Sequence, residues 1–198
     1  MKKVHLDLGT HYGQGLNQFI SMLNIDKSWQ VYSFEANPIT YQNFIKSNHY
    51  KNLLNHTNLI VINKAVYNKD TILNFNTEYS ADRGIRDGMA STLMRIDDWK
   101  PNIDNKHNFT SSTSVECIDL ARFVDEIDAD TITCKMDIEG AEFDVLEHLI
   151  ATQTILKFQS LWIEFHNLFF TDKNLYFNKK NDIIQYLNKN NIRIYDWH

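Results

Sequence analysis

Short apolar runs alternate along the chain with segments whose apolar residues recur at helical spacing. The runs have the length of strands and are bounded by polar or turn-forming residues. They cover residues 4–8, 30–34, 59–66, 131–138 and 160–165. Because such alternation is typical of βαβ units, it predicts an α/β, Rossmann-like fold with a mostly parallel central sheet and helices on both faces.

Helices are indicated both by spacing and by capping residues. One helix is predicted after the first strand, because its apolar residues lie at i, i+3, i+4 and i+7: Leu16, Phe19, Ile20 and Leu23. Asn37 is an N-cap residue followed by Pro38, which predicts a helix that ends near residue 47. Asp182 is expected to cap the last helix.

Two stretches fall outside this regular alternation. Residues 71–79 alternate as a further strand, which we expect to be antiparallel and to make the central sheet mixed. Residues 80–114 lose all periodicity, and a connection of this length inside a compact domain is usually functional or mobile. We therefore predict a single domain over residues 1–198, with residues 80–114 as a lid or substrate cap.

Composition restricts the class of protein and its surroundings. An apolar share of 43% and a charged share of 23% are those of an ordinary globular domain. The net charge of −5 gives no long-range attraction for nucleic acid. Cys117 and Cys134 stand in apolar runs, as reduced, packed thiols do. No run approaches the roughly 18 apolar residues of a membrane span, so we expect a cytoplasmic protein that binds neither nucleic acid nor membrane.

The turn between the first strand and the first helix carries a ligand-binding signal. Its sequence is Asp7-Leu8-Gly9-Thr10-His11-Tyr12-Gly13, and glycines at such a turn let a ligand approach the backbone closely. The spacing does not fit the GxGxxG of dinucleotide-binding proteins, because His11 and Gln14 stand at the later glycine positions, and no P-loop is present. The pattern suits a ligand without phosphates, such as the methionine and ribose portion of S-adenosylmethionine. The alternative is a plain strand-to-helix turn.

Glu35 strengthens the ligand-binding interpretation. It ends the second predicted strand, about 20 residues past the glycines, where an acidic side chain accepts hydrogen bonds from ribose hydroxyls. The alternative is a solvent-facing acid at a strand end. The two features together favour a nucleoside-binding site over either alternative.

The sequence resembles the FkbM-type methyltransferases. The matching order of motifs extends from residue 4 to about residue 166, and the Asp-Ile-Glu-Gly-Ala-Glu stretch is its most specific part. The motifs are the glycine turn, Phe34-Glu35-Ala36-Asn37-Pro38, Lys64-Ala65-Val66, Lys135-Met136-Asp137-Ile138-Glu139-Gly140-Ala141-Glu142 with Val145-Leu146, and Ile163-Glu164-Phe165-His166.

The resemblance implies a class I methyltransferase fold, S-adenosylmethionine as the methyl donor and, most often, O-methylation of a hydroxyl on a sugar or natural product. It implies that Asp7, Gly9 and Gly13 line the methionine end and that Glu35 binds the ribose. The predicted cofactor site is completed by Thr10, Ala36 and Ala65.

The end of the chain departs from the class I pattern. Such folds usually continue with two strands after the fifth, the last of them antiparallel, whereas only residues 192–197 remain here. The last antiparallel strand is therefore expected to be missing. An exposed sheet edge tends to be covered, so this edge is a candidate surface for a homodimer.

Acidic residues and a histidine follow the fourth and fifth predicted strands, where open α/β sheets bind their ligands. Asp137 and Glu139 lie where the fourth strand gives way to a helix, and Glu164 and His166, two residues apart at the end of the fifth strand, point to the same side. We assign catalysis to His166, Asp137 and Glu139. His166 is the first choice for the general base, because a neutral imidazole accepts a proton near neutral pH, and Asp137 is the second.

Each of these assignments has an alternative. Glu139 also suits a first-turn acid that interacts with the helix dipole, and His166 also suits a packed or capping histidine. Glu164, Asp137 and His166 could together hold a divalent cation, but we predict no metal.

Residues 80–114 contain Arg83, Arg86 and Arg95, which could bind an acidic or phosphorylated glycan through bidentate contacts. The alternative is a solvated loop. Our prediction is an S-adenosylmethionine-dependent O-methyltransferase that acts on a sugar, glycan or similar small polar acceptor. The alternatives are a non-catalytic binding protein that keeps the fold and a nucleic-acid cap ribose methyltransferase, which the acidic charge disfavours.

Overall fold

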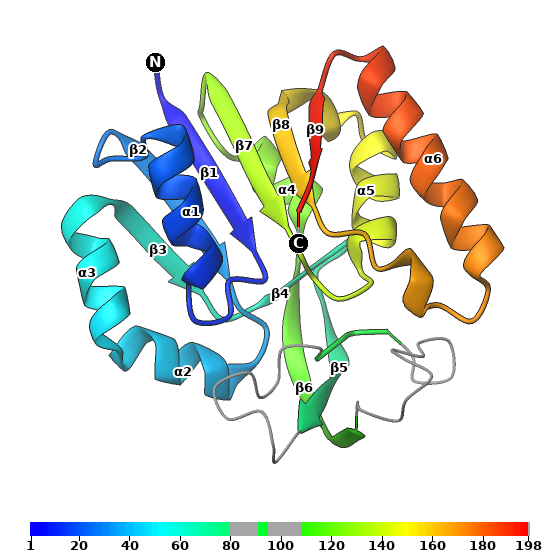
Figure 1. The fold of residues 1–198 in the computed structure, drawn as a ribbon, viewed down its shortest axis with the longest axis horizontal. Coiled ribbons are helices and arrows are strands. Elements are labelled where there is room, and N and C mark those ends of the chain that lie inside the picture. The colour runs from blue at the N-terminus through cyan, green and yellow to red at the C-terminus, as the bar shows by residue number, and fades with distance from the viewer. Residues whose placement is uncertain (80–90, 95–107, 198) are drawn as a thin grey trace.

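A parallel sheet of six strands forms the centre of the computed structural model, which describes residues 1–79, 91–94 and 108–197 (Figure 1). Its strand order is β3-β2-β1-β7-β8-β9, and every neighbouring pair is parallel. The strands are β1 (Lys3–Leu8), β2 (Trp29–Phe34), β3 (Asn58–Ile62), β7 (Thr131–Met136), β8 (Phe158–Ile163) and β9 (Arg193–Asp196). The predicted Rossmann-like α/β class is confirmed.

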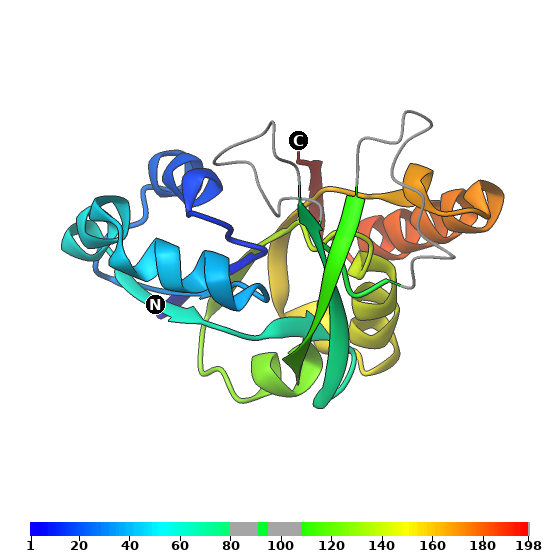
Figure 2. The same cartoon turned by 90° about the horizontal axis from the view of Figure 1, so that it is seen from below.

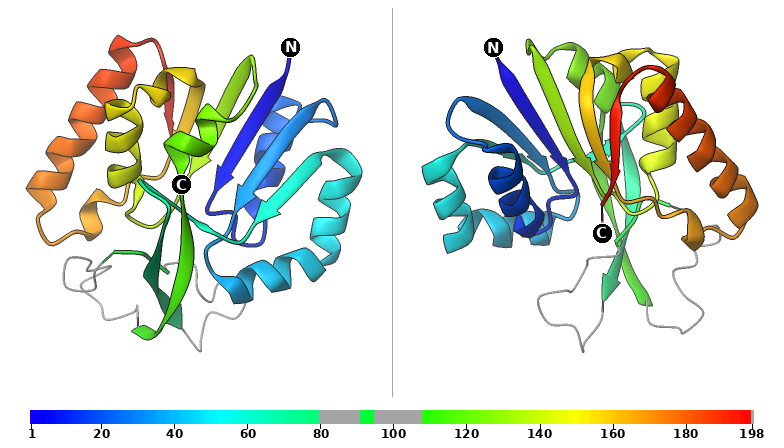
Figure 3. Two further views of the ribbon diagram at one scale, coloured as in Figure 1. Left: turned by 180° about the vertical axis from the view of Figure 1, so that it is seen from behind. Right: turned by 45° about the horizontal axis from the view of Figure 1, so that its top comes forward.

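The helices cover both faces of this sheet (Figure 2, Figure 3). Those of the first half of the chain lie on one face and those of the second half on the other: α1 (Gln14–Leu23), α2 (Pro38–Lys46) and α3 (Asn48–His56), then α4 (Leu120–Asp125), α5 (Glu142–Ala151) and α6 (Lys173–Lys189). The side chains of β1 alternate between the two faces of the sheet. Leu6 packs in the cluster that contains Phe143 of α5, whereas the His5 ring lies 4.9 Å from that of Phe19 in α1.

The antiparallel strand lies outside the central sheet. β5 (Thr71–Tyr79) pairs with β6 (Asn108–Asp119), and β4 (Ala65–Tyr67) runs parallel to β6 on its other side. The expectation of a mixed central sheet is therefore wrong. Because β5 and β6 satisfy each other's backbone groups along their length, they form a ribbon that projects beyond the carboxyl ends of the central strands (Figure 1). Residues 108–114, predicted to be irregular, belong to this ribbon.

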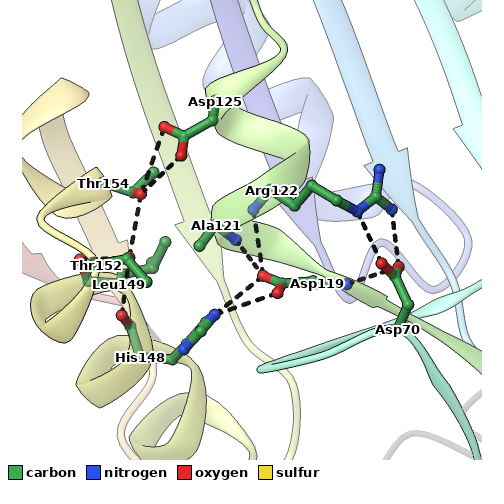
Figure 4. A network of polar contacts seen from close by, with 9 residues as sticks. All are labelled: Asp70, Asp119, Ala121, Arg122, Asp125, His148, Leu149, Thr152 and Thr154. Carbon is green, nitrogen blue, oxygen red and sulfur yellow. Dashed lines mark hydrogen bonds and ion pairs between the residues drawn. The ribbon is translucent and has the colours of Figure 1, made fainter.

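Polar contacts anchor the root of the ribbon to two helices (Figure 4). The Asp119 side chain caps α4 by accepting from the backbone N–H groups of Ala121 and Arg122, and it lies 3.1 Å from Nε2 of His148 in α5. The Arg122 guanidinium forms a two-pronged contact with Asp70, at the turn before β5. These contacts fix the ribbon over the same sheet end at which the pocket described below opens.

The end of the described chain corrects one expectation. β9 runs parallel to β8, like every other neighbouring pair of the described central sheet. Asp172 caps the last helix by accepting from Leu175 N–H, whereas Asp182, expected in that role, lies inside α6. β3 and β9 are the edges of the sheet, and dimerisation through an edge stays a prediction. None of the helices in the described part of the chain is both long and apolar enough to cross a membrane.

Candidate active site

A cavity of about 190 Å³ opens at the carboxyl ends of the central strands. It lies where the strand order reverses between β1 and β7, the place at which open α/β sheets bind ligands. Phe75 of β5 contributes to its wall, so the ribbon partly covers it. The predicted site residues in the lining are Gly9, Glu35, Ala36, Ala65, Asp137 and Glu139.

The glycine turn is shaped by close backbone and side-chain contacts. Gly9 has a φ of 78°, and a Cβ there would lie 1.8 Å from the carbonyl oxygen of Asp137. Gly13 has a φ of 77°, and a Cβ there would lie 2.7 Å from Cζ of Phe44. Gly9 therefore lets the turn meet the residues that follow β7, whereas Gly13 lets it pack on α2 and does not line the cavity. Buried Asp7 and Thr10 also lie behind the lining.

The Gly9→Ala variant should lower the free energy of unfolding by about 2 to 4 kcal/mol. An alanine there would be strained by the positive φ, and its Cβ would clash with the Asp137 carbonyl oxygen. Gly15→Ala is the matched control. Gly15 lies in α1, and its added Cβ would meet only Trp197, at 3.3 Å. Denaturant unfolding measures both. Equal, small changes would show that the close approach at Gly9 is not required.

Glu35 is held in place by the backbone around it. Its Oε2 accepts from His11 N–H at 2.9 Å, and its Oε1 accepts from Asn37 N–H at 2.8 Å. Each carboxylate oxygen keeps a further lone pair, and the side chain lines the cavity. Burial raises the pKa of Glu35 to about 7, against the lowering effect of the two N–H groups. The site therefore holds a preoriented hydrogen-bond acceptor.

Lys135 connects the glycine turn to Asp137, a role that the sequence analysis missed. Its Nζ donates to the Gly9 carbonyl at 2.7 Å and lies 3.2 Å from Oδ2 of Asp137 and 3.8 Å from Oδ1 of Asp7. Burial lowers the pKa of Lys135, but the carboxylates of Asp137 and Asp7 outweigh it, so the net pKa is raised. The available signal was a lysine inside an apolar strand, because a buried charge needs partners.

Four carboxylates surround the imidazole of His166, and we call these five residues the carboxylate–histidine cluster. The Nε2 atom lies 3.4 Å from Oε2 of Glu139, 3.8 Å from Oε1 of Glu164 and 4.0 Å from Oδ1 of Asp137. On the other side of the ring, Nδ1 lies 3.0 Å from Oε1 of Glu142. The three carboxylates near Nε2 also line the cavity. They follow β7 and β8, on the opposite side of β1 from β2 and Glu35.

Glu142 is the fully buried carboxylate of the cluster, and the sequence analysis did not assign it a role. Its carboxylate accepts from the backbone N–H groups of Ile138 and Gly140, both at 2.9 Å, and from Nδ1 of His166. It thereby fixes a turn in which Glu139 has a φ of 54° and Gly140 a φ of 101°. The signal in the sequence was an acid in the first turn of the helix predicted to begin at Glu139.

The charge state of His166 differs from the one that a general base needs. Burial lowers its pKa, but Glu142, Glu139 and Asp137 outweigh that effect and raise the pKa of His166 to about 10. Burial also raises the pKa of Glu139 well above its ordinary value, His166 opposes this shift and Asp137 adds to it. In the protein without ligands, the imidazole therefore already carries both of its protons near neutral pH and cannot accept another, which leaves the carboxylates as the groups that can accept one.

Of the predicted catalytic residues, Asp137 and Glu139 line the cavity and His166 lies directly behind them. Arg83, Arg86 and Arg95 lie outside the described residues. The lid prediction for residues 80–114 therefore stays a prediction.

A parallel sheet with a glycine turn, an acid after the second strand and a pocket at the strand-order reversal is the arrangement in which open α/β proteins bind ligands. Residues 7–194 match the methyltransferase FkbM domain, so the chain belongs to the FkbM methyltransferase family.

One solved structure similar to the chain is the methyltransferase FkbM from Methylobacillus flagellatus KT. The two are 17% identical with a TM-score of 0.49, over 97% of this chain and 38% of that one. The chain thus spans well under half the length of that protein. Comparison with curated proteins gives no match.

Proposed function

We propose that the protein is an S-adenosylmethionine-dependent methyltransferase that methylates a hydroxyl of a sugar, glycan or similar small polar acceptor. The observation that carries the proposal is that Glu35 and three carboxylates of the carboxylate–histidine cluster, those of Asp137, Glu139 and Glu164, line the same cavity. One end offers an acceptor for ribose hydroxyls, and the other offers several acceptors for a proton. Membership of the FkbM family supports methyl transfer as the reaction.

The lining fits the proposed cofactor. Glu35 is fixed by two backbone N–H groups and would accept from the ribose hydroxyls, while Gly9 would lie beside the methionine end. Ala36 and Ala65 leave room in the wall for the nucleoside. When bound, S-adenosylmethionine supplies an electrophilic methyl group on a sulfonium.

The cluster would deprotonate and orient the acceptor. A neutral hydroxyl is a weak nucleophile, and a positioned general base contributes about 10²- to 10⁴-fold. Glu139 and Asp137 reach the cavity, and the raised pKa of Glu139 makes its carboxylate a stronger base than that of an ordinary glutamate. His166, charged and buried behind them, would hold these carboxylates in position.

Incubation with methyl-labelled S-adenosylmethionine and a panel of neutral and acidic saccharides tests the proposal. We expect mass spectrometry to place the label on a hydroxyl oxygen of one class of saccharide. Label on an amine or a thiol would replace the proposed acceptor. Cofactor binding without transfer to any acceptor would favour a non-catalytic binding protein.

A further inference from the structure

We propose that Asp137, Glu139 and His166 bind a divalent first-row transition cation such as Mn²⁺. One oxygen of each carboxylate and one imidazole nitrogen lie within 4.8 Å of one another. Two ligand atoms about 2.1 Å from an ion are about 3.0 Å apart in octahedral and about 3.4 Å apart in tetrahedral geometry, and Nε2 of His166 lies 3.4 Å from Oε2 of Glu139. Asp137 Oδ1, 4.0 Å from Nε2, needs only a small side-chain movement to join them.

His166 is oriented as metal-binding histidines are. Such a ring donates one N–H to a carboxylate or carbonyl, which directs the lone pair of the other nitrogen toward the ion. Here Glu142 receives Nδ1–H at 3.0 Å, and it is itself fully buried and fixed by two backbone N–H groups. Glu142 lies on the far side of the ring from the proposed ion and is not a ligand. The ring therefore presents Nε2 to the cavity side.

The charges of the site favour a cation at this position. Among the described residues, carboxylates outnumber basic groups in these ion pairs: Asp7, Asp137, Glu139, Glu142 and Glu164 face Lys135 and His166. A single N–H on Nε2 can serve one carboxylate at a time, whereas a divalent ion that displaces this proton attracts all three carboxylates that face it.

The donor set indicates the kind of ion. One imidazole and two carboxylates suit Mn²⁺, Fe²⁺ or Zn²⁺ better than Ca²⁺ or Mg²⁺, which prefer oxygen ligands alone. Three protein ligands leave further coordination positions, and these would face the cavity. This inference replaces the sequence-based expectation of no metal.

The consequence for catalysis rests on the proposed function, although the cation site itself does not. An acceptor hydroxyl on the ion would be more acidic, because the cation stabilises the oxygen that has lost its proton. With the ion bound, Glu139 and Asp137 are ligands, so Glu164, which lines the cavity outside the ligand set, would take up this proton in place of Glu139.

Binding of Mn²⁺ to the full chain, without cofactor or acceptor, tests the site. Electron paramagnetic resonance, which detects unbound Mn²⁺, should show about one binding site per chain. The Glu139→Gln and His166→Asn variants should each bind Mn²⁺ at least about tenfold more weakly. Glu142→Gln should weaken binding about 10- to 100-fold although it removes no ligand. Glu147→Gln is the matched control on the same helix, because Glu147 is half-exposed and pairs with Lys179.

A wild-type measurement keeps the test independent of how the variants fold. Bound Mn²⁺ should selectively broaden the ring resonances of His166 in NMR spectra and spare those of exposed His56. Absence of Mn²⁺ binding, broadening centred elsewhere, or unchanged affinity in folded Glu139→Gln and His166→Asn proteins would overturn the proposal. Mn²⁺ binding without any methyl transfer would retain the site and reject the proposed function instead.

Discussion

The His166→Ala variant should turn over its acceptor at least about a hundredfold more slowly than the wild type, with nearly unchanged cofactor affinity. His166 touches the carboxylates at the acceptor end of the cavity and lies behind its lining, away from Glu35. Its loss would leave Asp137 and Glu139 without the group that holds them. Steady-state kinetics and calorimetry measure the two effects separately.

Two further variants sharpen this result. Asp137→Asn should harm both turnover and cofactor affinity, because Asp137 also faces Lys135, which holds the Gly9 carbonyl. His56→Ala, at an exposed position at the end of α3, should leave both unchanged. Near-normal turnover of a folded His166→Ala enzyme would remove the cluster's histidine from the mechanism.

The second large effect concerns Glu35. Cofactor affinity should fall by up to about tenfold per pH unit below 7, because the pKa of Glu35 is raised to about 7 and only its ionised form accepts fully from ribose hydroxyls. Glu35→Gln should bind about 10- to 100-fold more weakly at pH 8 and lose most of this dependence. Calorimetry with S-adenosylhomocysteine between pH 6 and 8 measures both, with Glu126→Gln, on an exposed acid, as the control.

The same shift has a consequence for stability. The pKa of Glu35 is raised from 4.5 to about 7 on folding, so the folded protein binds more protons than the unfolded chain between these values. Its free energy of unfolding therefore decreases as pH rises through this window. Stability that increases from pH 5 to 7 in the wild type relative to Glu35→Gln would contradict the assigned burial of this carboxyl.

Local patterns predicted most elements of the central sheet. Apolar runs indicated its strands, and Asn37 with Pro38 indicated the start of α2. The strand predicted over residues 59–66 is wrong in extent, because it is divided between β3 of the central sheet and β4 of the smaller sheet. Alternation in residues 71–79 also predicted β5 correctly. It could not predict the partner, because alternation defines the two faces of a strand and not the sheet that it joins. Asp182 failed as a cap because Asp172, ten positions earlier, begins the helix.

The candidate site was predictable in its location but not in its charges. The ends of the strands placed Glu35, Asp137 and Glu139 correctly on one cavity. The charge of His166 depends on Glu142, which lies on another element and is buried only in the folded protein. Pairing at this distance along the chain leaves no local pattern, so the sequence favoured a neutral imidazole.

A crystal structure of the complex with S-adenosylhomocysteine tests the central claim most directly. We predict that the ribose hydroxyls lie within hydrogen-bond distance of the Glu35 carboxylate and that the sulfur lies between Gly9 and the carboxylate–histidine cluster. A ligand bound away from this cavity, or a ribose that makes no contact with Glu35, would contradict the account.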